Sequence, residues 1–183
     1  MSNKINSRVI GQLTQDERFS DWWRSEEISV PFFGDKKFPV IFMDFNPGTD
    51  KQFIEQTDDA LKHFLGLGEK DRQAISNIVH QNCIDFLDTF DFDEVDEPYR
   101  NIQHEEVWNF VHPSEIYVAR RHRGDEDIYI TVACECDWEQ EHGLQLVFRQ
   151  GKKLTRVSGQ DGHLTEADAY DKPDGKDELL SKF

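Results

Sequence analysis

The sequence has few cysteines, no long apolar run and no apolar leader. Its three cysteines, Cys83, Cys134 and Cys136, are odd in number and sparsely spaced, which does not indicate a disulfide framework. Residues 1–12 are mixed and polar, so no signal peptide is expected, and no run of about 18 apolar residues exists to cross a membrane. These absences predict a protein of the reducing cytoplasm with no membrane partner.

Basic residues are also scarce, with 21 Lys and Arg against 37 Asp and Glu, a formal net charge of −16. A field of this sign repels a phosphate backbone and excludes nucleic-acid binding unless a basic patch exists. The one candidate patch is residues 120–123, Arg-Arg-His-Arg, but the acidic residues 125–127 that follow favour a charged hairpin tip. The acidity instead predicts a basic protein as partner.

Large aromatic residues compensate for an apolar content of 37%, because 14 Phe and 4 Trp can form a core from few side chains. The sequence Thr-Gln-Asp-Glu at 14–17 predicts a short helix that ends near residue 25. Alternating apolar residues predict a hairpin over 28–45, and apolar residues at helical spacing predict helices near 50–65 and 69–90. Four further strands are expected at 116–121, 128–138, 144–149 and 153–158.

We therefore predict an α+β fold with an N-terminal β-hairpin, two central helices and a C-terminal antiparallel four-stranded meander. Three parts are expected: residues 1–25 as an N-terminal segment with a short helix, 26–170 as a single α+β domain, and 171–183 as an acidic flexible tail. The acidic stretch 91–99 lacks the glycine and glutamate positions of an EF-hand loop and predicts a solvated linker.

The densest group of reactive side chains is the sequence Cys-Glu-Cys-Asp-Trp-Glu-Gln-Glu-His-Gly-Leu, which begins at Cys134. A period of two places Cys134 and Cys136 on the apolar face of a strand and places Glu135 and Asp137 on the other face. Buried thiols behave as small apolar groups, so a core position is favoured. A zinc site formed by both cysteines and His142 lacks a fourth ligand, and a thioredoxin-type motif needs two residues between its cysteines. We predict no metal and no cofactor.

Glu139, Glu141 and His142 follow this strand in a predicted turn, and His163 lies in a similar turn farther along the chain. A carboxylate–histidine pair can perform general acid–base catalysis, so these four residues are the candidate catalytic groups. No Gly-x-Ser-x-Gly elbow, His-Glu-x-x-His helix or phosphate-binding glycine loop accompanies them. The structural alternative is a tight turn in which Gly143 supplies permissive backbone angles.

The signature Cys-x-Cys-x-Trp-Glu-x-Glu-His-Gly-Leu, followed by Arg-Val-Ser-Gly-Gln-Asp-Gly-His-Leu at 156–164, resembles a bacterial family of unknown function. Val-Pro-Phe-Phe at 30–33 and the stretch 60–67 add to the resemblance, which covers most of residues 28–170. The resemblance implies no known activity and no catalytic residue. It does imply a bacterial cytoplasmic protein, of a kind associated with neutralising toxins.

Three functional hypotheses follow, and the oligomeric state is left open. The leading hypothesis is a non-enzymatic module of the immunity type that binds a basic protein through Glu135, Asp137, Glu139, Glu141 and His142. The first alternative is a small metal-dependent or acid–base hydrolase centred on the Glu-x-Glu-His turn. The second alternative is a structural or oligomerisation module with Trp22 and Trp23 in an exposed patch.

Overall fold

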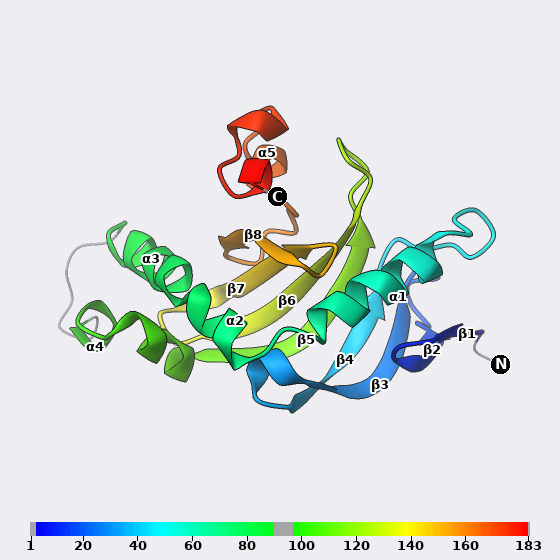
Figure 1. The fold of residues 1–183 in the computed structure, drawn as a ribbon, viewed down its shortest axis with the longest axis horizontal. Coiled ribbons are helices and arrows are strands. Elements are labelled where there is room, and N and C mark those ends of the chain that lie inside the picture. The colour runs from blue at the N-terminus through cyan, green and yellow to red at the C-terminus, as the bar shows by residue number, and fades with distance from the viewer. Residues whose placement is uncertain (1–2, 90–96, 183) are drawn as a thin grey trace.

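The computed structural model describes residues 3–89 and 97–182, and within these ranges eight strands form one mixed sheet (Figure 1). The strands lie side by side in chain order, from β1 at one edge to β8 at the other. Their bounds are β1 (Lys4–Ser7), β2 (Gly11–Gln15), β3 (Trp23–Val30), β4 (Lys36–Phe42), β5 (Val111–Arg120), β6 (Ile128–Cys136), β7 (Glu139–Arg149) and β8 (Lys153–Ser158).

The described helices fall mainly in two groups, one between β4 and β5 and one after β8. The first group comprises α1 (Phe53–Phe64), α2 (Glu69–Ala74), α3 (Ser76–Leu87), α4 (Glu97–Arg100) and the 3-10 helix η3 (His104–Phe110). The second group comprises α5 (Glu166–Ala169) and the 3-10 helices η4 (Asp174–Lys176) and η5 (Leu180–Lys182). A separate 3-10 turn, η1 (Pro31–Phe33), joins β3 to β4.

One parallel pair joins the two halves of the sheet. β4 and β5 run parallel, with Val40 opposite Ile116, while the other neighbouring strands pair antiparallel. A parallel pair needs a long crossover connection, and residues 43–110 with the first helical group provide it. These helices lie across one face of the sheet, as Figure 1 shows.

The predicted arrangement of a hairpin, two helices and a separate four-stranded meander is therefore wrong. Strands occur along the whole chain, and the hairpin expected over 28–45 belongs to a longer β3–β4 pair inside the same sheet as β5–β8. The physical reason is that β4 pairs with a strand far away in the sequence. Hydrophobic periodicity identifies strands but does not specify which distant strand each one will pair with.

The helix expected from residue 14 to residue 25 is also wrong. Thr14 lies within β2, where it pairs with Lys4 on one side and Arg24 on the other. Leu13 in this strand is fully buried, and Trp23 at the start of β3 is 3% exposed. Burial of two large apolar side chains contributes more than a helix cap, which is worth about 1 kcal/mol. The second central helix is interrupted at residue 75, which separates α2 from α3.

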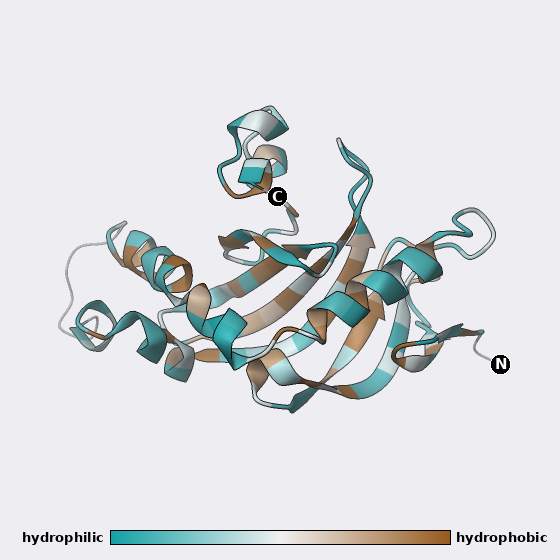
Figure 2. Ribbon diagram, in the orientation of Figure 1, coloured by the Kyte–Doolittle hydropathy of each residue, from teal (hydrophilic) through white to brown (hydrophobic). Residues whose placement is uncertain are grey.

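The main core lies between the sheet and the first helical group. The sheet contributes alternate side chains, and the prediction that one face of β6 is apolar is confirmed for Ile128, Ile130, Val132, Cys134 and Cys136. The helices contribute Phe53, Leu61, Phe64, Val79, Cys83 and Leu87. Figure 2 shows the hydrophobic residues concentrated on the strands and the hydrophilic residues on much of the helical surface.

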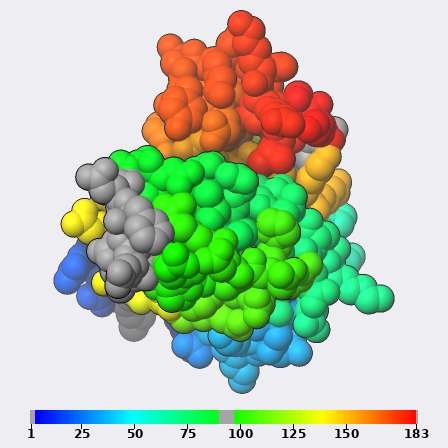
Figure 3. Space-filling model, turned by 90° about the vertical axis from the view of Figure 1, so that its left-hand side faces the viewer, coloured from blue at the N-terminus to red at the C-terminus, as the bar shows by residue number. Residues whose placement is uncertain are grey.

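Residues 160–182, here called the C-terminal segment, cover part of the opposite, outer face of the sheet. Tyr129 and Val147 belong to this face and form a small second cluster with Ala167 and Leu180. In Figure 3 the segment, coloured orange to red, projects beyond the helical part of the molecule. The segment therefore divides the outer face into a covered part and an open part.

The predicted divisions of the chain after residues 25 and 170 stay predictions. In the structure β1 and β2 pair within the common sheet, and Asp177, from the range expected to form a tail, is fully buried. Residues 91–96 of the predicted acidic linker lie outside the described residues. None of the described helices is long and apolar enough to traverse a lipid bilayer.

Candidate functional site

Glu139, Glu141 and His142 lie in the first residues of β7 and not in the predicted turn, because the strand already begins at Glu139 and pairs irregularly with β6 there. This start of β7 is organised around the carboxylate of Glu139. Its Oε1 accepts the backbone N–H of Glu141 at 2.8 Å, and both of its oxygens lie 3.1 Å from the backbone nitrogen of His142. The Glu139 side chain is only 9% exposed. Backbone donors need acceptors, and the pairing of β6 with β7 is irregular at this point, so the carboxylate has a structural role as the acceptor for two of them.

His142 is exposed beside this carboxylate. Its side chain is 70% exposed, and its Nδ1 lies 3.3 Å from Oε2 of Glu139. Gly143 follows with a φ of +61°, and a Cβ atom there would lie 2.5 Å from the carbonyl oxygen of Cys134. The prediction that Gly143 supplies permissive backbone angles is confirmed. The structure thus brings Glu139 and His142 together and leaves Glu141 exposed.

The loop that carries His163 contacts the same turn through other groups. The backbone N–H of Gln160 donates to the carbonyl of His142 at 3.1 Å, and Gln160 Nε2 donates to the carbonyl of Cys134 at 2.9 Å. His163 is exposed, and its own carbonyl accepts a hydrogen bond from the side chain of Gln145. The two turns therefore meet through hydrogen bonds that involve backbone atoms.

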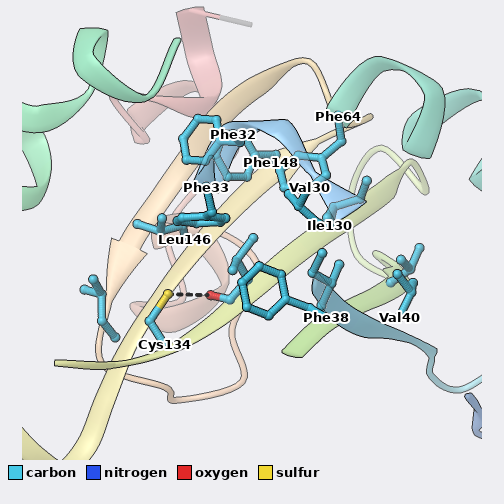
Figure 4. Close-up of a cluster of buried hydrophobic side chains, with 14 of the residues drawn as sticks. Val30, Phe32, Phe33, Phe38, Val40, Phe64, Ile130, Cys134, Leu146 and Phe148 are labelled. Atoms are coloured by element: carbon cyan, nitrogen blue, oxygen red, sulfur yellow. Dashed lines mark hydrogen bonds between the residues drawn. The ribbon is translucent and has the colours of Figure 1, made fainter. Parts of the chain in front are cut away.

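Cys134 and Cys136 are buried, and Figure 4 shows Cys134 within the apolar cluster. Their Sγ atoms lie 3.9 Å from the carbonyl of Val132 and 3.4 Å from the carbonyl of Glu139, respectively. Burial raises the pKa of Cys134 far above its ordinary value and raises the pKa of Cys136 to about 12. Both groups stay thiols at neutral pH, whereas metal binding and nucleophilic attack need the thiolate. Among residues 3–89 and 97–182, no three His, Cys, Asp or Glu side chains are grouped to hold a metal ion.

Three exposed carboxylates flank the same hairpin: Glu135, Asp137 and Glu141, here called the acidic turn. His112 lies opposite Glu135 in the β5–β6 pair, and its Nε2 donates to Asp137 at 2.8 Å. The predicted partner-binding residues therefore differ in their exposure to solvent. The acidic turn and His142 are exposed for contact, whereas Glu139 is enclosed.

A buried arginine from the predicted hairpin tip ties the C-terminal segment to the sheet. Arg121 is 2% exposed and donates to Asp125, Asp168 and Asp174 over distances of 2.6 to 2.9 Å. These bonds, most strongly the one to Asp174, raise the pKa of Arg121 and keep it charged. Asp125 was a visible partner in the sequence, but Asp168 and Asp174 are brought close only by the fold.

A hollow of about 430 Å³ on the open part of the outer face is lined by aromatic side chains that include Phe19, Trp22 and Tyr117. Phe19 is 52% exposed, whereas Trp23 is 3% exposed and its Nε1 donates to the carbonyl of Phe45. The patch predicted for the two adjacent tryptophans therefore contains Trp22 together with Phe19. Sequence reasoning missed the exposure of Phe19 because the helix predicted over 14–25 would turn this side chain inward, and that helix does not form.

A larger hollow of about 1040 Å³ lies between α3 and the C-terminal segment. Four basic and four acidic side chains line it. Several of them pair with one another, as Arg156 does with Glu166 and Lys182 with Glu178. Because its charges balance, this hollow favours neither an anion nor a cation.

The fold and these sites define a mixed-sheet α+β protein whose most reactive residues serve the core and the turns. The family model described as "Domain of unknown function (DUF6985)" matches residues 9–164, and the chain belongs to that family. The chain is also similar to Serpin B5 of Plecturocebus moloch, with 26% identity over 137 residues. That match covers 73% of this chain but only 34% of the serpin, about a third of its length. No solved structure matches the chain.

Proposed function

We propose that this chain is a non-enzymatic protein-binding module of the bacterial cytoplasm, of the immunity type, which masks a basic partner. The observation that carries the proposal is the charge of −16, together with the exposed carboxylates of the acidic turn at one end of the sheet. A surface of this kind attracts a basic protein and accelerates its association. Three free cysteines, all buried, support a reducing compartment.

The role of Glu139 favours binding over hydrolysis. A general base needs a carboxylate or imidazole that can reach a substrate proton. The Glu139 carboxylate is instead enclosed and accepts the N–H groups of Glu141 and His142. The remaining support for the hydrolase alternative is the contact of Glu139 with the exposed side chain of His142 at the start of β7.

The test is a binding measurement against the proteins encoded beside the gene for this chain. Each purified protein is titrated by calorimetry at low and at physiological salt. We expect one basic protein to bind, with an affinity that falls as salt rises. The variant Glu135→Gln/Asp137→Asn/Glu141→Gln should weaken that binding about tenfold, since removing rim charges mainly slows association.

A matched control carries the same change of charge elsewhere. The variant Glu55→Gln/Asp59→Asn/Glu69→Gln removes three exposed carboxylates from α1 and α2. It should lower the affinity much less than the first variant. An affinity that does not depend on salt, or an equal loss in both variants, would refute the proposal.

A further inference from the structure

The connection between β2 and β3 holds an aromatic side chain outward in a hydrogen-bonded loop. The loop comprises residues 16–22. The backbone N–H of Asp16 donates to the carbonyl of Trp22 at 2.9 Å, and the N–H of Trp22 donates to the carbonyl of Phe19 at 3.0 Å. The Asp16 carboxylate accepts the N–H groups of Arg18 and Phe19 at 2.8 and 3.0 Å. These bonds close the loop locally, so Phe19 is presented with little conformational freedom left to lose on binding.

The aromatic rings form a continuous surface across the loop and the sheet. The rings of Phe19 and Trp22 lie 4.9 Å apart between centroids, and Trp22 meets Tyr117 edge-on at 6.2 Å. Ile41, opposite Tyr117 in the parallel β4–β5 pair, forms part of the floor of the hollow. Aromatic side chains that are both exposed and rigid are the usual anchors of protein–protein interfaces.

Charged side chains surround this aromatic surface, and the carboxylates among them outnumber the arginines. Asp16, Glu17 and Glu115 line the same hollow, together with Arg18 and Arg24. Glu115 accepts hydrogen bonds of 2.5 Å from Arg24 and from the hydroxyl of Tyr117. Burial works against ionisation of Glu115, but these two bonds lower its pKa overall and keep it charged. Burial and the bond to Glu115 raise the pKa of Tyr117 to about 12, so its ring stays a neutral phenol.

We propose that Phe19, Trp22 and Tyr117 form the docking site for an arginine side chain of the basic partner. This inference rests on the function proposed above. A guanidinium group binds the face of an aromatic ring, and its alkyl stem packs on neighbouring apolar surface. The three carboxylates of the hollow outnumber its two arginines, Arg18 and Arg24, so a net attraction for a cation remains. Arg24 is already paired with Glu115. A second copy of this chain is a poor occupant, because two molecules of charge −16 repel each other.

The first experiment titrates the whole protein with the peptide acetyl-Gly-Arg-Leu-Arg-Gly-amide and follows the tryptophan indole N–H signals by NMR. The variant Trp22→Phe assigns the signal of Trp22. We expect the peptide to shift this signal, and a peptide with citrulline in place of both arginines to bind about tenfold more weakly. Phe19→Ala should also weaken binding of the arginine peptide several-fold.

Tyr170→Ala is the matched control, because Tyr170 is 68% exposed and lies outside the aromatic hollow. This variant should bind the arginine peptide like the unchanged protein. Equal binding of the citrulline peptide, no binding of the arginine peptide, or no effect of Phe19→Ala would overturn the proposed docking site. Concentration-dependent dimerisation that Phe19→Ala abolishes would also overturn it, with a second copy as the occupant.

The same titration separates this proposal from the proposed function. If the arginine peptide shifts the backbone signals of the acidic turn and leaves Trp22 unchanged, the docking site is refuted and the binding function is retained. If no neighbouring basic protein binds the whole chain in calorimetry, the proposed function itself is refuted.

Discussion

Glu139 shows how a single side chain in a reactive-looking motif can serve the backbone. Its carboxylate was a candidate catalytic base, yet it is enclosed at the start of β7 and accepts two N–H groups. The neighbouring Glu141 has the same chemistry but is exposed. The two glutamates are the same residue type in the same short motif. Only the burial of their side chains distinguishes their roles.

We therefore predict that Glu139→Ala lowers the free energy of unfolding by about 1–2 kcal/mol, because two part-buried backbone donors lose a charged acceptor. Glu141→Ala should change it by less than about 0.5 kcal/mol, as expected for an exposed residue. Urea denaturation of both variants measures the difference. Equal stability of the two variants would mean that the turn does not depend on the Glu139 carboxylate.

At the scale of elements, the attachment of the C-terminal segment depends on a few ionic contacts. Its apolar contact with the sheet is small: in the second cluster of buried side chains the segment contributes Ala167 and Leu180, and the sheet contributes Tyr129 and Val147. Arg121, the residue that follows β5, links the sheet to Asp168 and Asp174 of the segment. The family model ends at residue 164, so most of this segment lies beyond the matched range.

Arg121→Met should release the segment, because three carboxylates would then face one another without their buried partner. Breaking a buried ion pair costs about 3–5 kcal/mol. Arg123→Met is the control, since Arg123 is 59% exposed and pairs with the 86% exposed Asp171, and surface pairs contribute about 0–1 kcal/mol. Hydrogen exchange should show lost protection over residues 165–182 in the first variant only. Retained protection there would contradict the anchoring role of Arg121.

Acid should release the same segment. The hydrogen bond from Arg121 lowers the pKa of Asp174 below its ordinary value of 3.8. Because the folded-state pKa is the lower one, this contribution to stability is complete above about pH 4 and is lost as the pH falls through the folded-state value. Limited proteolysis of residues 165–182 at neutral and acid pH measures the release. The variant Asp174→Asn should show a smaller change between the two conditions, and an equal change would contradict this assignment.

At the scale of the whole molecule, the charge of −16 acts against the compact state. Raising the salt concentration from about 0.01 to about 0.1 M shortens the Debye length from about 30 to about 10 Å and screens this repulsion. We expect the melting temperature at neutral pH to rise by about 2–4 °C, which corresponds to about 1 kcal/mol for a chain of this size.

The control for this effect is the same salt series near pH 4.7, the isoelectric point of the sequence. There the net charge is close to zero, so added salt should change the melting temperature little. A fall in melting temperature with salt at neutral pH would contradict the prediction. It would mean that favourable ion pairs, such as those of Arg121, dominate over the net repulsion.

The sequence by itself determined which side chains face the core on β6, because alternation along a strand is a local property. It also determined the need for glycine at position 143, the acidity of the chain and the absence of complete catalytic motifs. Only the tertiary structure decided the parallel β4–β5 pair, the clamp at Arg121 and the partly exposed surface of Phe19, Trp22 and Tyr117. Each of these joins residues far apart in the chain, and their pairing depends on how the whole sheet packs.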